Sequence, residues 1–168
     1  ADKLVESFSR SYDLPTVTVR PFNTYGPRQS ARAVIPTIIT QALTADCIRL
    51  GSLTTRRDFT YVGDTVAGFL RAALAPDVAG EEINLGTGDD IAIGELAERV
   101  IALVGRPVAI VTEAERLRPE KSEVRRLLSG NDRARRVLGW QPAWSLDDGL
   151  RQTVAWIGDH LDFYRVGR

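Results

Sequence analysis

The sequence predicts an α/β fold, and two observations support that prediction. Short runs rich in β-branched residues alternate along the chain with longer segments whose apolar residues recur at helical spacing. The clearest run, Thr16–Val19, leads directly into a loop that contains Pro21, Asn23 and Gly26, as a buried strand does when it leaves a sheet. In open α/β sheets, ligands lie just beyond the carboxyl ends of strands, so we expect a site at this loop.

Helices and strands alternate through the first half of the chain. In order, the patterns predict a helix over Asp2–Tyr12, a strand over Thr16–Arg20, a helix over Ile35–Leu43, a strand over Cys47–Leu50, a strand over Asp58–Val62 and a helix over Val66–Ala75. The polar segment Gly63-Asp64-Thr65 offers capping groups for the last of these helices.

Glycines and a capping pattern mark the helix ends in the second half. Gly105 and Gly139 suit helix C-caps, and Ser145 with Asp148 resembles a capping box. The predicted elements are a strand over Glu82–Leu85, a helix over Glu95–Val104, a strand over Val108–Thr112, a helix over Asp132–Leu138 and a helix from Ser145 to about Ile157.

Composition indicates a soluble protein of one domain. The chain has 168 residues, 43% of them hydrophobic, and no apolar run approaches the ~18–20 residues of a membrane span. Its 22 basic and 22 acidic residues cancel, which argues against bulk nucleic-acid binding. Cys47 and His160 are the sole residues of their types, which excludes an internal disulfide and a zinc site built on such ligands. We expect a cytoplasmic protein without a signal peptide and without nucleic-acid or membrane partners.

Several short motifs follow one another in an order that matches one known family. They are Arg20–Pro27 (RPFNTYGP), Val34–Pro36, Arg57–Asp64 (RDFTYVGD), Asn84–Gly88 (NLGTG), Arg118-Pro119, Leu138–Pro142 (LGWQP) and Ser145–Leu150. The ordered set covers nearly the whole chain and resembles the extended short-chain dehydrogenase/reductases that act on nucleotide sugars. The runs Arg28–Thr37 and Leu117–Val124 are most similar to the branch that dehydrates UDP-N-acetylglucosamine at carbons 4 and 6.

Two motifs of this family do not occur in the chain. The glycine-rich GxxGxxG turn that binds NAD at a helix N-terminus is missing, because Gly86-Thr87-Gly88 lies too late and lacks the third glycine. The catalytic YxxxK is also missing, and Ala1–Phe8 resembles the segment that follows it. We therefore expect residues 1–168 to be one C-terminal fragment, about half of an enzyme. NAD would be bound mainly by the other half, and the fragment alone would be inactive, with no catalytic residue of its own.

The resemblance also implies how the chain is organised. Strands Thr16–Arg20 and Glu82–Leu85 would form the edge of a Rossmann-type NAD-binding sheet. Interleaved with them, the segments around Ile48–Val62 and Glu113–Trp140 would form a smaller α/β lobe that binds the nucleotide sugar. Proteins of this family usually form homodimers, and the resemblance implies an interface built from helices of which Asp2–Tyr12 would be a part.

Two arginines match family residues that contact the diphosphate of the substrate. The planar guanidinium stays charged and donates paired hydrogen bonds to phosphate oxygens, which suits Arg57 and Arg118 to this role. The alternative for each is an ordinary surface arginine. Neighbours on a strand point to opposite faces, so only one of Arg56 and Arg57 should face the site, and the family match selects Arg57.

The remaining candidate residues also come from the resemblance. Asn23 and Asn84 match residues that reach the substrate phosphates, with a loop-holding role as the alternative for Asn23. The base-pocket candidates are Val34, Ile48 and Leu50, for which plain core packing is the alternative. Pro21 and Phe22 match the segment that borders the nicotinamide. We interpret Asp64 as a helix cap, Tyr25 as a motif residue without a chemical role, Tyr61 as a strand aromatic and His160 as solvent-exposed.

Three functions remain open at this point. The first is the substrate-binding half of an NAD-dependent nucleotide-sugar 4,6-dehydratase with a substrate similar to UDP-N-acetylglucosamine. The second is a nucleotide-sugar 4-epimerase or decarboxylase of the same family, because the residues that separate these chemistries would lie before Ala1. The third is a non-catalytic module that binds a nucleotide sugar or is completed by a partner chain.

Overall fold

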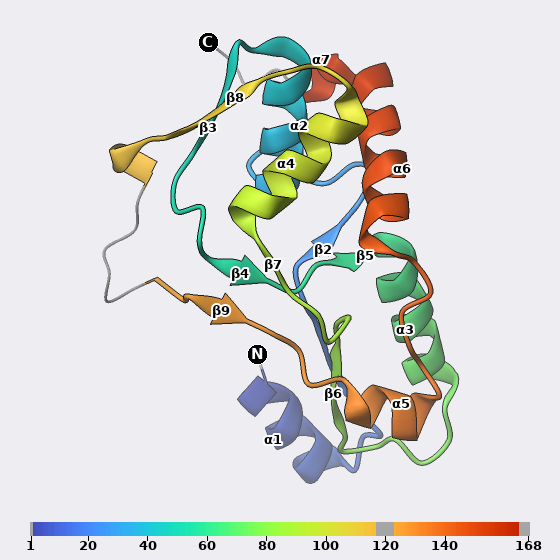
Figure 1. The fold of residues 1–168 in the computed structure, drawn as a ribbon. Coiled ribbons are helices and arrows are strands. Elements are labelled where there is room, and N and C mark those ends of the chain that lie inside the picture. The colour runs from blue at the N-terminus through green and yellow to red at the C-terminus, as the bar shows by residue number, and fades with distance from the viewer. Residues whose placement is uncertain (1, 117–122, 165–168) are drawn as a thin grey trace. The chain divides into compact units, whose positions relative to one another are not determined.

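The computed structural model describes residues 2–116 and 123–164, and it divides the chain into two compact units (Figure 1). Unit 1 consists of Ala1–Thr24, Asp58–Asp89 and Leu128–Trp144. Unit 2 consists of Tyr25–Arg57, Asp90–Leu127 and Ser145–Arg168. The chain therefore passes repeatedly from one unit to the other, and segments far apart in sequence build each of them.

Unit 1 is built on a parallel pair of strands, β1 and β6, that align Thr18 with Glu82 and Pro21 with Leu85. Its elements are α1 (Asp2–Tyr12), β1 (Thr18–Pro21), β5 (Thr60–Tyr61), α3 (Val62–Leu74), β6 (Glu82–Leu85) and α5 (Asp132–Leu138). Ile83 and Leu85 of β6 are fully buried in a cluster that also contains Trp140. A Cβ at Gly68 of α3 would lie 2.4 Å from Leu85 Cδ1, so glycine permits the close packing of α3 on β6.

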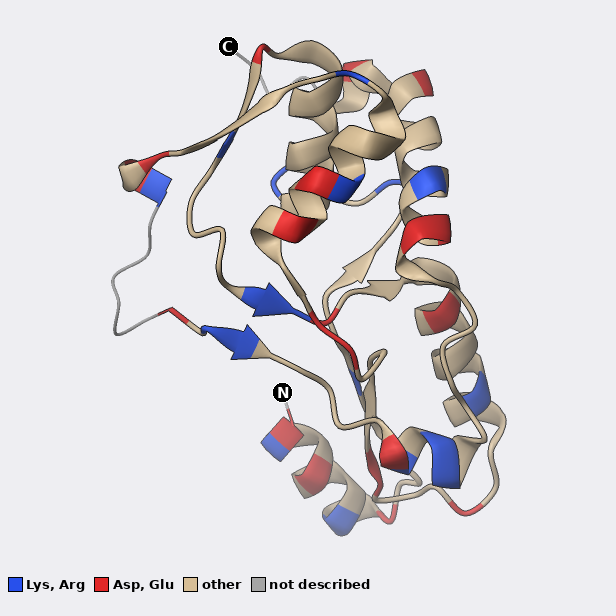
Figure 2. Ribbon diagram, in the orientation of Figure 1, with Lys and Arg blue, Asp and Glu red and all other residues tan. Residues whose placement is uncertain are grey.

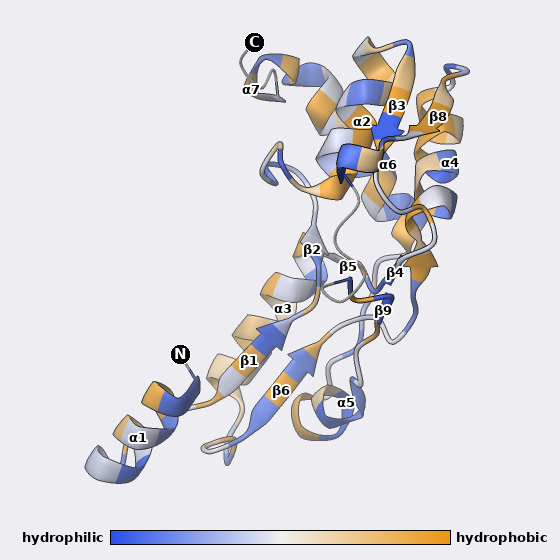
Figure 3. Ribbon diagram, turned by 90° about the vertical axis from the view of Figure 1, so that its left-hand side faces the viewer, coloured by the Kyte–Doolittle hydropathy of each residue, from blue (hydrophilic) through white to orange (hydrophobic). Residues whose placement is uncertain are grey.

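Unit 2 contains a helical core and two small sheets. Its helices are α2 (Val34–Thr44), α4 (Ile93–Val104), α6 (Leu146–Asp159), α7 (Leu161–Tyr164) and the short η1 (Ala114–Arg116). One sheet pairs β3 (Cys47–Leu50) in parallel with β8 (Ala109–Thr112). The other has the order β7 (Ile91–Ala92), β4 (Arg56–Arg57), β9 (Arg126–Leu127). Hydrophobic residues recur along α4, as helical periodicity requires of a helix that contributes Leu96, Ala97 and Val100 to the core (Figure 3).

The α/β fold class is confirmed, and several elements have the predicted bounds. Periodicity located α1, β3, β6 and α5 to the residue, and Gly105 and Gly139 adopt the left-handed C-cap conformation with φ of 72° and 58°. Ser145 caps α6, since its hydroxyl accepts a hydrogen bond from Asp148 N at 3.1 Å. The two-residue strand β2 (Thr24–Tyr25) follows β1 at the point where the chain leaves unit 1.

The segment around Asp58 and Asp64 differs from the prediction. The strand expected over Asp58–Val62 shortens to β5, and α3 starts at Val62, four residues before the predicted start. Asp64 is not a cap: it lies inside α3, and its carboxylate accepts hydrogen bonds from Ala143 N (2.9 Å) and Trp144 N (3.1 Å). The polar residues that resembled a cap therefore form tertiary contacts instead.

Candidate functional site

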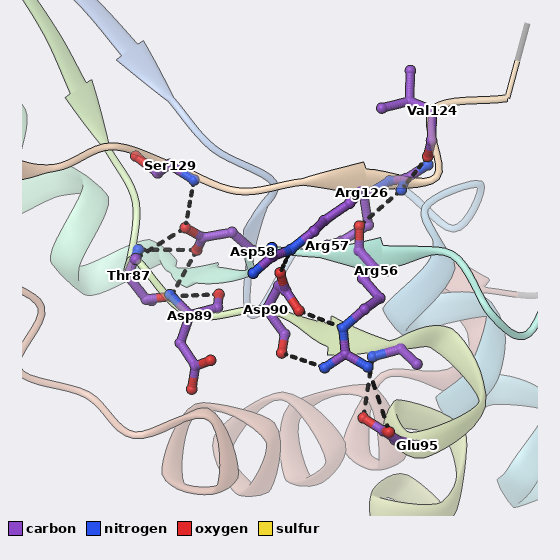
Figure 4. Close-up of polar contacts among 12 residues, drawn as sticks. Arg56, Arg57, Asp58, Thr87, Asp89, Asp90, Glu95, Val124, Arg126 and Ser129 are labelled. Atoms are coloured by element: carbon purple, nitrogen blue, oxygen red, sulfur yellow. Dashed lines mark hydrogen bonds and ion pairs between the residues drawn. The ribbon is translucent and has the colours of Figure 1, made fainter.

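A buried carboxylate organises the carboxyl ends of the strands in unit 1. Asp58 has no exposed surface, and its Oδ1 accepts hydrogen bonds from Thr87 N (2.9 Å) and Thr87 Oγ1 (2.7 Å). Its Oδ2 accepts from Gly88 N (3.0 Å) and Ser129 N (3.2 Å) (Figure 4). We call Asp58, Thr87, Gly88 and Ser129 the Asp58 cluster. Buried carboxylates need such partners, and these donors come from two loops distant in sequence.

The same contacts explain why Gly86-Thr87-Gly88 is not a phosphate-binding turn. The two amides that would cradle an anion, Thr87 N and Gly88 N, already donate to Asp58. A Cβ at Gly86 would lie 2.2 Å from Ser129 Cβ, and Gly88 has a φ of 78°, so both positions require glycine for internal packing. The glycines of this motif thus serve the Asp58 cluster.

Asn23 lies next to this cluster at the end of β1. Its Nδ2 donates to Asp58 O at 2.7 Å, and its backbone carbonyl accepts from Thr60 N at 3.4 Å. The Nδ2 group of Asn23 therefore holds the loop in place, which is the alternative role expected for this residue. Within the described part of the chain no residue donates to Asn23 Oδ1, which leaves that oxygen for a ligand.

The other candidates of unit 1 lie on the two parallel strands or directly after them. Pro21 is exposed and Phe22 is half-buried, and Phe22 N donates to Leu85 O at 2.8 Å. Asn84 is half-buried, and its only described side-chain contact is a long one, 3.5 Å from Nδ2 to Gly130 O. Because β1 and β6 run in parallel, Phe22, Asn23 and the Asp58 cluster share one edge of the pair, where α/β proteins bind ligands.

In unit 2, Arg57 lies on the central strand of the three-stranded sheet, with its side chain 16% exposed. Its Nη1 donates to Val124 O (2.6 Å) and Arg56 O (2.8 Å), and its Nη2 donates to Glu123 Oε1 (3.1 Å). A guanidinium has five N–H donors, and these contacts use three of them. The described residues therefore hold the plane of the Arg57 guanidinium and leave two donors for a ligand.

Arg56 has a different set of partners, as strand alternation predicts (Figure 4). Its Nε donates to Asp90 Oδ1 (2.5 Å), its Nη2 to Asp90 O (3.0 Å), and its Nη1 lies 3.5 Å from Glu95 Oε1. Asp90 Oδ2 accepts from Arg126 Nε on β9. Arg126, and after it Arg56, hold the pKa of the Asp90 carboxyl below its ordinary value.

The base-pocket candidates have mixed burial. Ile48 is fully buried and Leu50 is 5% exposed on β3, while Val34 at the start of α2 is half-buried. Leu50 O accepts from Glu113 N at 2.8 Å, next to the ladder with β8. The Ile48 and Leu50 side chains therefore pack in the core, and a ligand role for them would use backbone atoms. Arg118, the second predicted diphosphate arginine, lies outside the described residues.

Two aromatic residues and the histidine have structural partners. Tyr25 is 1% exposed and donates from its hydroxyl to Leu146 O at 3.0 Å, whereas Tyr61 stacks at a tilt against Trp144 with centroids 4.5 Å apart. His160 is half-buried and not fully solvent-exposed, because its ring stacks on Trp156 at 4.2 Å. Among the described residues, no group of three or more histidine, cysteine, aspartate or glutamate side chains could hold a metal ion.

Two cavities of the described structure are lined by no predicted site residue. One, of about 470 Å³ in unit 1, lies against α1 and is lined by Lys3, Glu6 and Arg133 among others. The other, of about 540 Å³ in unit 2, is lined by Arg28, Trp156 and neighbouring residues. Across residues 2–116 and 123–164, no helix is long and apolar enough to cross a bilayer. The candidate residues that the structure describes lie on β1, β3, β4 and β6, directly after β1, and at the start of α2.

Sequence reasoning missed Asp58 and Asp90, the two carboxylates that organise these groups. Asp58 lies inside the RDFTYVGD motif and Asp90 directly after the NLGTGD run, but neither motif marks its aspartate as a site residue. A signal was present for Asp58, because an aspartate in an aromatic, β-branched run must find partners if it is buried. Its partners are 29 to 71 residues away, so the sequence alone could not name them.

Comparisons with known proteins identify the family that the chain resembles in sequence. A model of the family described as GDP-mannose 4,6 dehydratase matches residues 1–153. The chain is 37% identical over 147 residues to a UDP-glucose 4-epimerase of Mycolicibacterium smegmatis, covering 85% of this chain and 45% of the relative. It is 30% identical over 169 residues to a dTDP-glucose 4,6-dehydratase of Xanthomonas campestris, covering 93% of this chain and 46% of the relative. The chain thus spans about half the length of the curated relatives it matches.

A solved structure extends the comparison to three dimensions. UDP-glucuronic acid 4-epimerase from Bacillus cereus, in complex with UDP-glucuronic acid and NAD, aligns with a TM-score of 0.87 at 25% identity. The alignment covers 95% of this chain and 50% of that one. This likeness confirms the Rossmann-type α/β fold that the sequence predicts.

Proposed function

The chain belongs to the extended short-chain dehydrogenase/reductase family of NAD-dependent nucleotide-sugar epimerases and dehydratases, and from this membership we propose that it forms the substrate-binding half of a nucleotide-sugar 4,6-dehydratase. The family model that matches residues 1–153 is one of dehydratases. The Arg28–Thr37 and Leu117–Val124 runs favour UDP-N-acetylglucosamine or a similar sugar nucleotide as substrate.

The geometry of Arg57 is the observation on which this proposal rests most. Its guanidinium donates three hydrogen bonds, to Arg56 O of β4, Val124 O and Glu123 Oε1, and among the described residues two of its N–H donors have no acceptor. A fixed guanidinium with two remaining donors suits the bidentate recognition of a phosphate group. We assign the substrate diphosphate to Arg57, with Asn23, Asn84 and Arg118 as further contacts. Val34, Ile48 and Leu50 would border the base.

The described residues fit only the border of an NAD site. Pro21 ends β1 and Phe22 follows it, where a nicotinamide could lie, whereas the Thr87 and Gly88 amides donate to Asp58. Hydride acceptance from C4 of the sugar is the chemistry that NAD supplies when bound. The part of this chain in the reaction is to hold the diphosphate and orient the hexose while the sugar reacts.

A specific observation favours a 4-epimerase as the second candidate. The 37% identity to the M. smegmatis UDP-glucose 4-epimerase exceeds the 30% identity to the X. campestris dehydratase. Both reactions begin with oxidation at C4 and need the substrate diphosphate to be bound in the same way. The described residues therefore suit either reaction. We also propose a cytoplasmic homodimer, for which α1 offers an exposed apolar face.

The diphosphate role predicts a large loss of affinity when Arg57 is replaced. Calorimetry on the full-length protein would measure the dissociation constants of UDP-N-acetylglucosamine, UDP-glucose, dTDP-glucose and GDP-mannose. For the tightest of the four, Arg57→Ala should weaken binding by about 2–4 kcal/mol, roughly 30- to 800-fold, since the change also leaves Glu123 without its cation.

The matched control for this experiment is Arg99→Ala. Arg99 of α4 also pairs with one carboxylate, Asp147, but its side chain is 50% exposed. That variant should keep the affinity of the unmodified protein. Equal affinities of Arg57→Ala and Arg99→Ala would remove Arg57 from the site.

Product analysis separates the two candidate reactions. A dehydratase loses water across C5 and C6 and returns the hydride to C6, so its 4-keto product carries a methyl group that proton NMR detects. A 4-epimerase returns the hydride to C4 and forms no methyl group. We expect the methyl signal with UDP-N-acetylglucosamine. An inverted C4 without it would establish the epimerase, and binding without turnover would favour the non-catalytic module.

A further inference from the structure

One carboxylate connects all three strands of the small sheet in unit 2. Asp90, whose side chain is 4% exposed, directly precedes β7. Its Oδ1 accepts from Arg56 Nε of β4 at 2.5 Å, and its Oδ2 accepts from Arg126 Nε of β9 (Figure 4). We call Arg56, Asp90 and Arg126 the Asp90 bridge.

The pairing of β4 with β9 has two weaknesses that this bridge offsets. The ladder is only two residues long, aligning Arg56 with Arg126 and Arg57 with Leu127. Arg56 and Arg126 are therefore direct cross-strand neighbours of like charge, which is destabilising in a sheet (Figure 2). A carboxylate bound to both guanidiniums neutralises the repulsion and holds the two strands in register.

The register of β9 determines where the Arg57 guanidinium lies. Val124 and Glu123, which fix Arg57 through hydrogen bonds of 2.6 Å and 3.1 Å, immediately precede Arg125 and β9. The backbone bond from Arg56 N to Arg125 O at 2.9 Å is the first link between the strands on that side. If β9 moves relative to β4, the partners of Arg57 move with it.

We propose that Asp90 is a positioning residue: by holding β9 against β4, it fixes the Glu123-Val124 segment and so aims the Arg57 guanidinium at the diphosphate of the substrate. This inference rests on the proposed function, because it assumes that Arg57 binds the diphosphate. In this role Asp90 acts through Arg56 and Arg126, and not through a contact with the ligand.

A double-mutant cycle in the full-length protein tests the inference. The four proteins are the unmodified one, Asp90→Asn, Arg57→Ala and the double variant. Calorimetry measures their affinity for the nucleotide sugar that binds tightest among UDP-N-acetylglucosamine, UDP-glucose, dTDP-glucose and GDP-mannose. Asp147→Asn is the matched control, because Asp147 pairs with exposed Arg99 on the same unit.

A positioning role predicts coupling between the two sites. Asp90→Asn should weaken binding about 10-fold or more in the unmodified protein and by less than about 2-fold in the Arg57→Ala background. Asp147→Asn should leave the affinity unchanged in both backgrounds. Arg126→Gln breaks the same bridge from a side chain that is 62% exposed, and it should reproduce the pattern even where Asp90→Asn folds poorly.

The possible failures are distinguishable. If Arg57→Ala leaves affinity unchanged, the proposed diphosphate role of Arg57 fails, and this inference fails with it. If Arg57→Ala weakens binding but Asp90→Asn and Arg126→Gln have no effect, Asp90 does not position Arg57. Equal losses in both backgrounds would also overturn the inference, because they would mean a general structural effect independent of Arg57.

Discussion

Single carboxylates hold the irregular parts of this chain in place. Asp58 and Asp64 both accept backbone hydrogen bonds from the segment Leu128–Trp144 of unit 1, at Ser129, Ala143 and Trp144. Asp90 has the corresponding role for guanidiniums in unit 2. A strand of two residues forms few backbone hydrogen bonds with its neighbour. Carboxylate side chains therefore supply hydrogen-bond acceptors that a longer strand would provide from its backbone. Hydrogen bonds to charged groups are about twice as strong as neutral ones.

At this scale we predict that Gly86→Ala strongly destabilises the protein. The new methyl group would lie 2.2 Å from Ser129 Cβ and 2.8 Å from Asp58 Oδ2, and the buried cluster has no space for it. Overpacking and the loss of one or more buried hydrogen bonds should lower the free energy of unfolding by about 2–4 kcal/mol. Chemical denaturation of the full-length protein measures this change.

Gly130→Ala is the control for that prediction. Gly130 lies one residue beyond Ser129, but a methyl group added there would meet no described atom within 4 Å, and its φ is not positive. The same substitution should therefore change the free energy of unfolding by no more than about 0.5 kcal/mol. Similar stabilities of the two variants would mean that the Asp58 cluster tolerates repacking. The glycine of the NLGTG motif would then need another explanation.

The role of a residue could be predicted where it belongs to a recognisable motif. It could not be predicted where it depends on a partner far away in the sequence. Strand alternation separated Arg56 from Arg57, and the structure gives them different carboxylate partners, Asp90 and Glu123. The roles of Asp58 and Asp64 depend on residues up to 80 positions away, which no local pattern encodes. Asn23 shows both features, since the sequence indicates a loop-holding role as the alternative to a ligand role, whereas its actual partner, Asp58 O, lies 35 residues away.

At the scale of elements, length separates what the sequence predicted from what it did not. Helices such as α1 and α5, and strands such as β3 and β6, have enough residues to show a period. The two-residue strands β4, β7 and β9 show none, because they form only when tertiary contacts bring them together. The start of α3 was misplaced for a related reason: Tyr61 is its N-cap without a side-chain hydrogen bond, so no capping signal marks the position.

The small sheet of unit 2 illustrates how such short elements support function. It combines an antiparallel pair, β4 with β7, and a parallel pair, β4 with β9, each two residues long. Such short ladders contribute few hydrogen bonds, and among the described residues the Asp90 bridge adds ion pairs from one carboxylate to both β4 and β9. The position of Arg57, the proposed diphosphate-binding residue, therefore depends more on the ion pairs of the Asp90 bridge than on backbone hydrogen bonds between the strands.

At the scale of the whole molecule, the chain changes unit after residues 24, 57, 89, 127 and 144. Two of these boundaries separate neighbouring residues of the candidate site and its supports. Arg57 belongs to unit 2 and Asp58 to unit 1, while Asp89 belongs to unit 1 and Asp90 to unit 2. A motif such as RDFTYVGD therefore contributes to both units at once. This explains why motifs in a fixed order identified the family, whereas no composition shift marked a boundary between units.

The exposed apolar face of α1 is the surface that the proposed homodimer would bury. No residue of α1 is buried, and Leu4, Phe8 and Tyr12 are 63%, 48% and 67% exposed at intervals of four residues. Such spacing places them on one helix face. In a twofold-symmetric dimer each substitution acts twice. A buried phenylalanine contributes about 1.5–3 kcal/mol, so Phe8→Glu should weaken dimerisation by more than about 100-fold.

Sedimentation velocity on the full-length protein measures this effect, with Leu74→Glu as the control. Leu74 at the end of α3 is 82% exposed, so it offers the same change of charge on a different surface. We expect Phe8→Glu to shift the protein to monomer and Leu74→Glu to leave the dimer intact. A dimer that survives Phe8→Glu would exclude α1 from the interface. Dissociation by Leu74→Glu alone would place the interface on α3, because a charge buried without a partner disrupts only the surface that must exclude water.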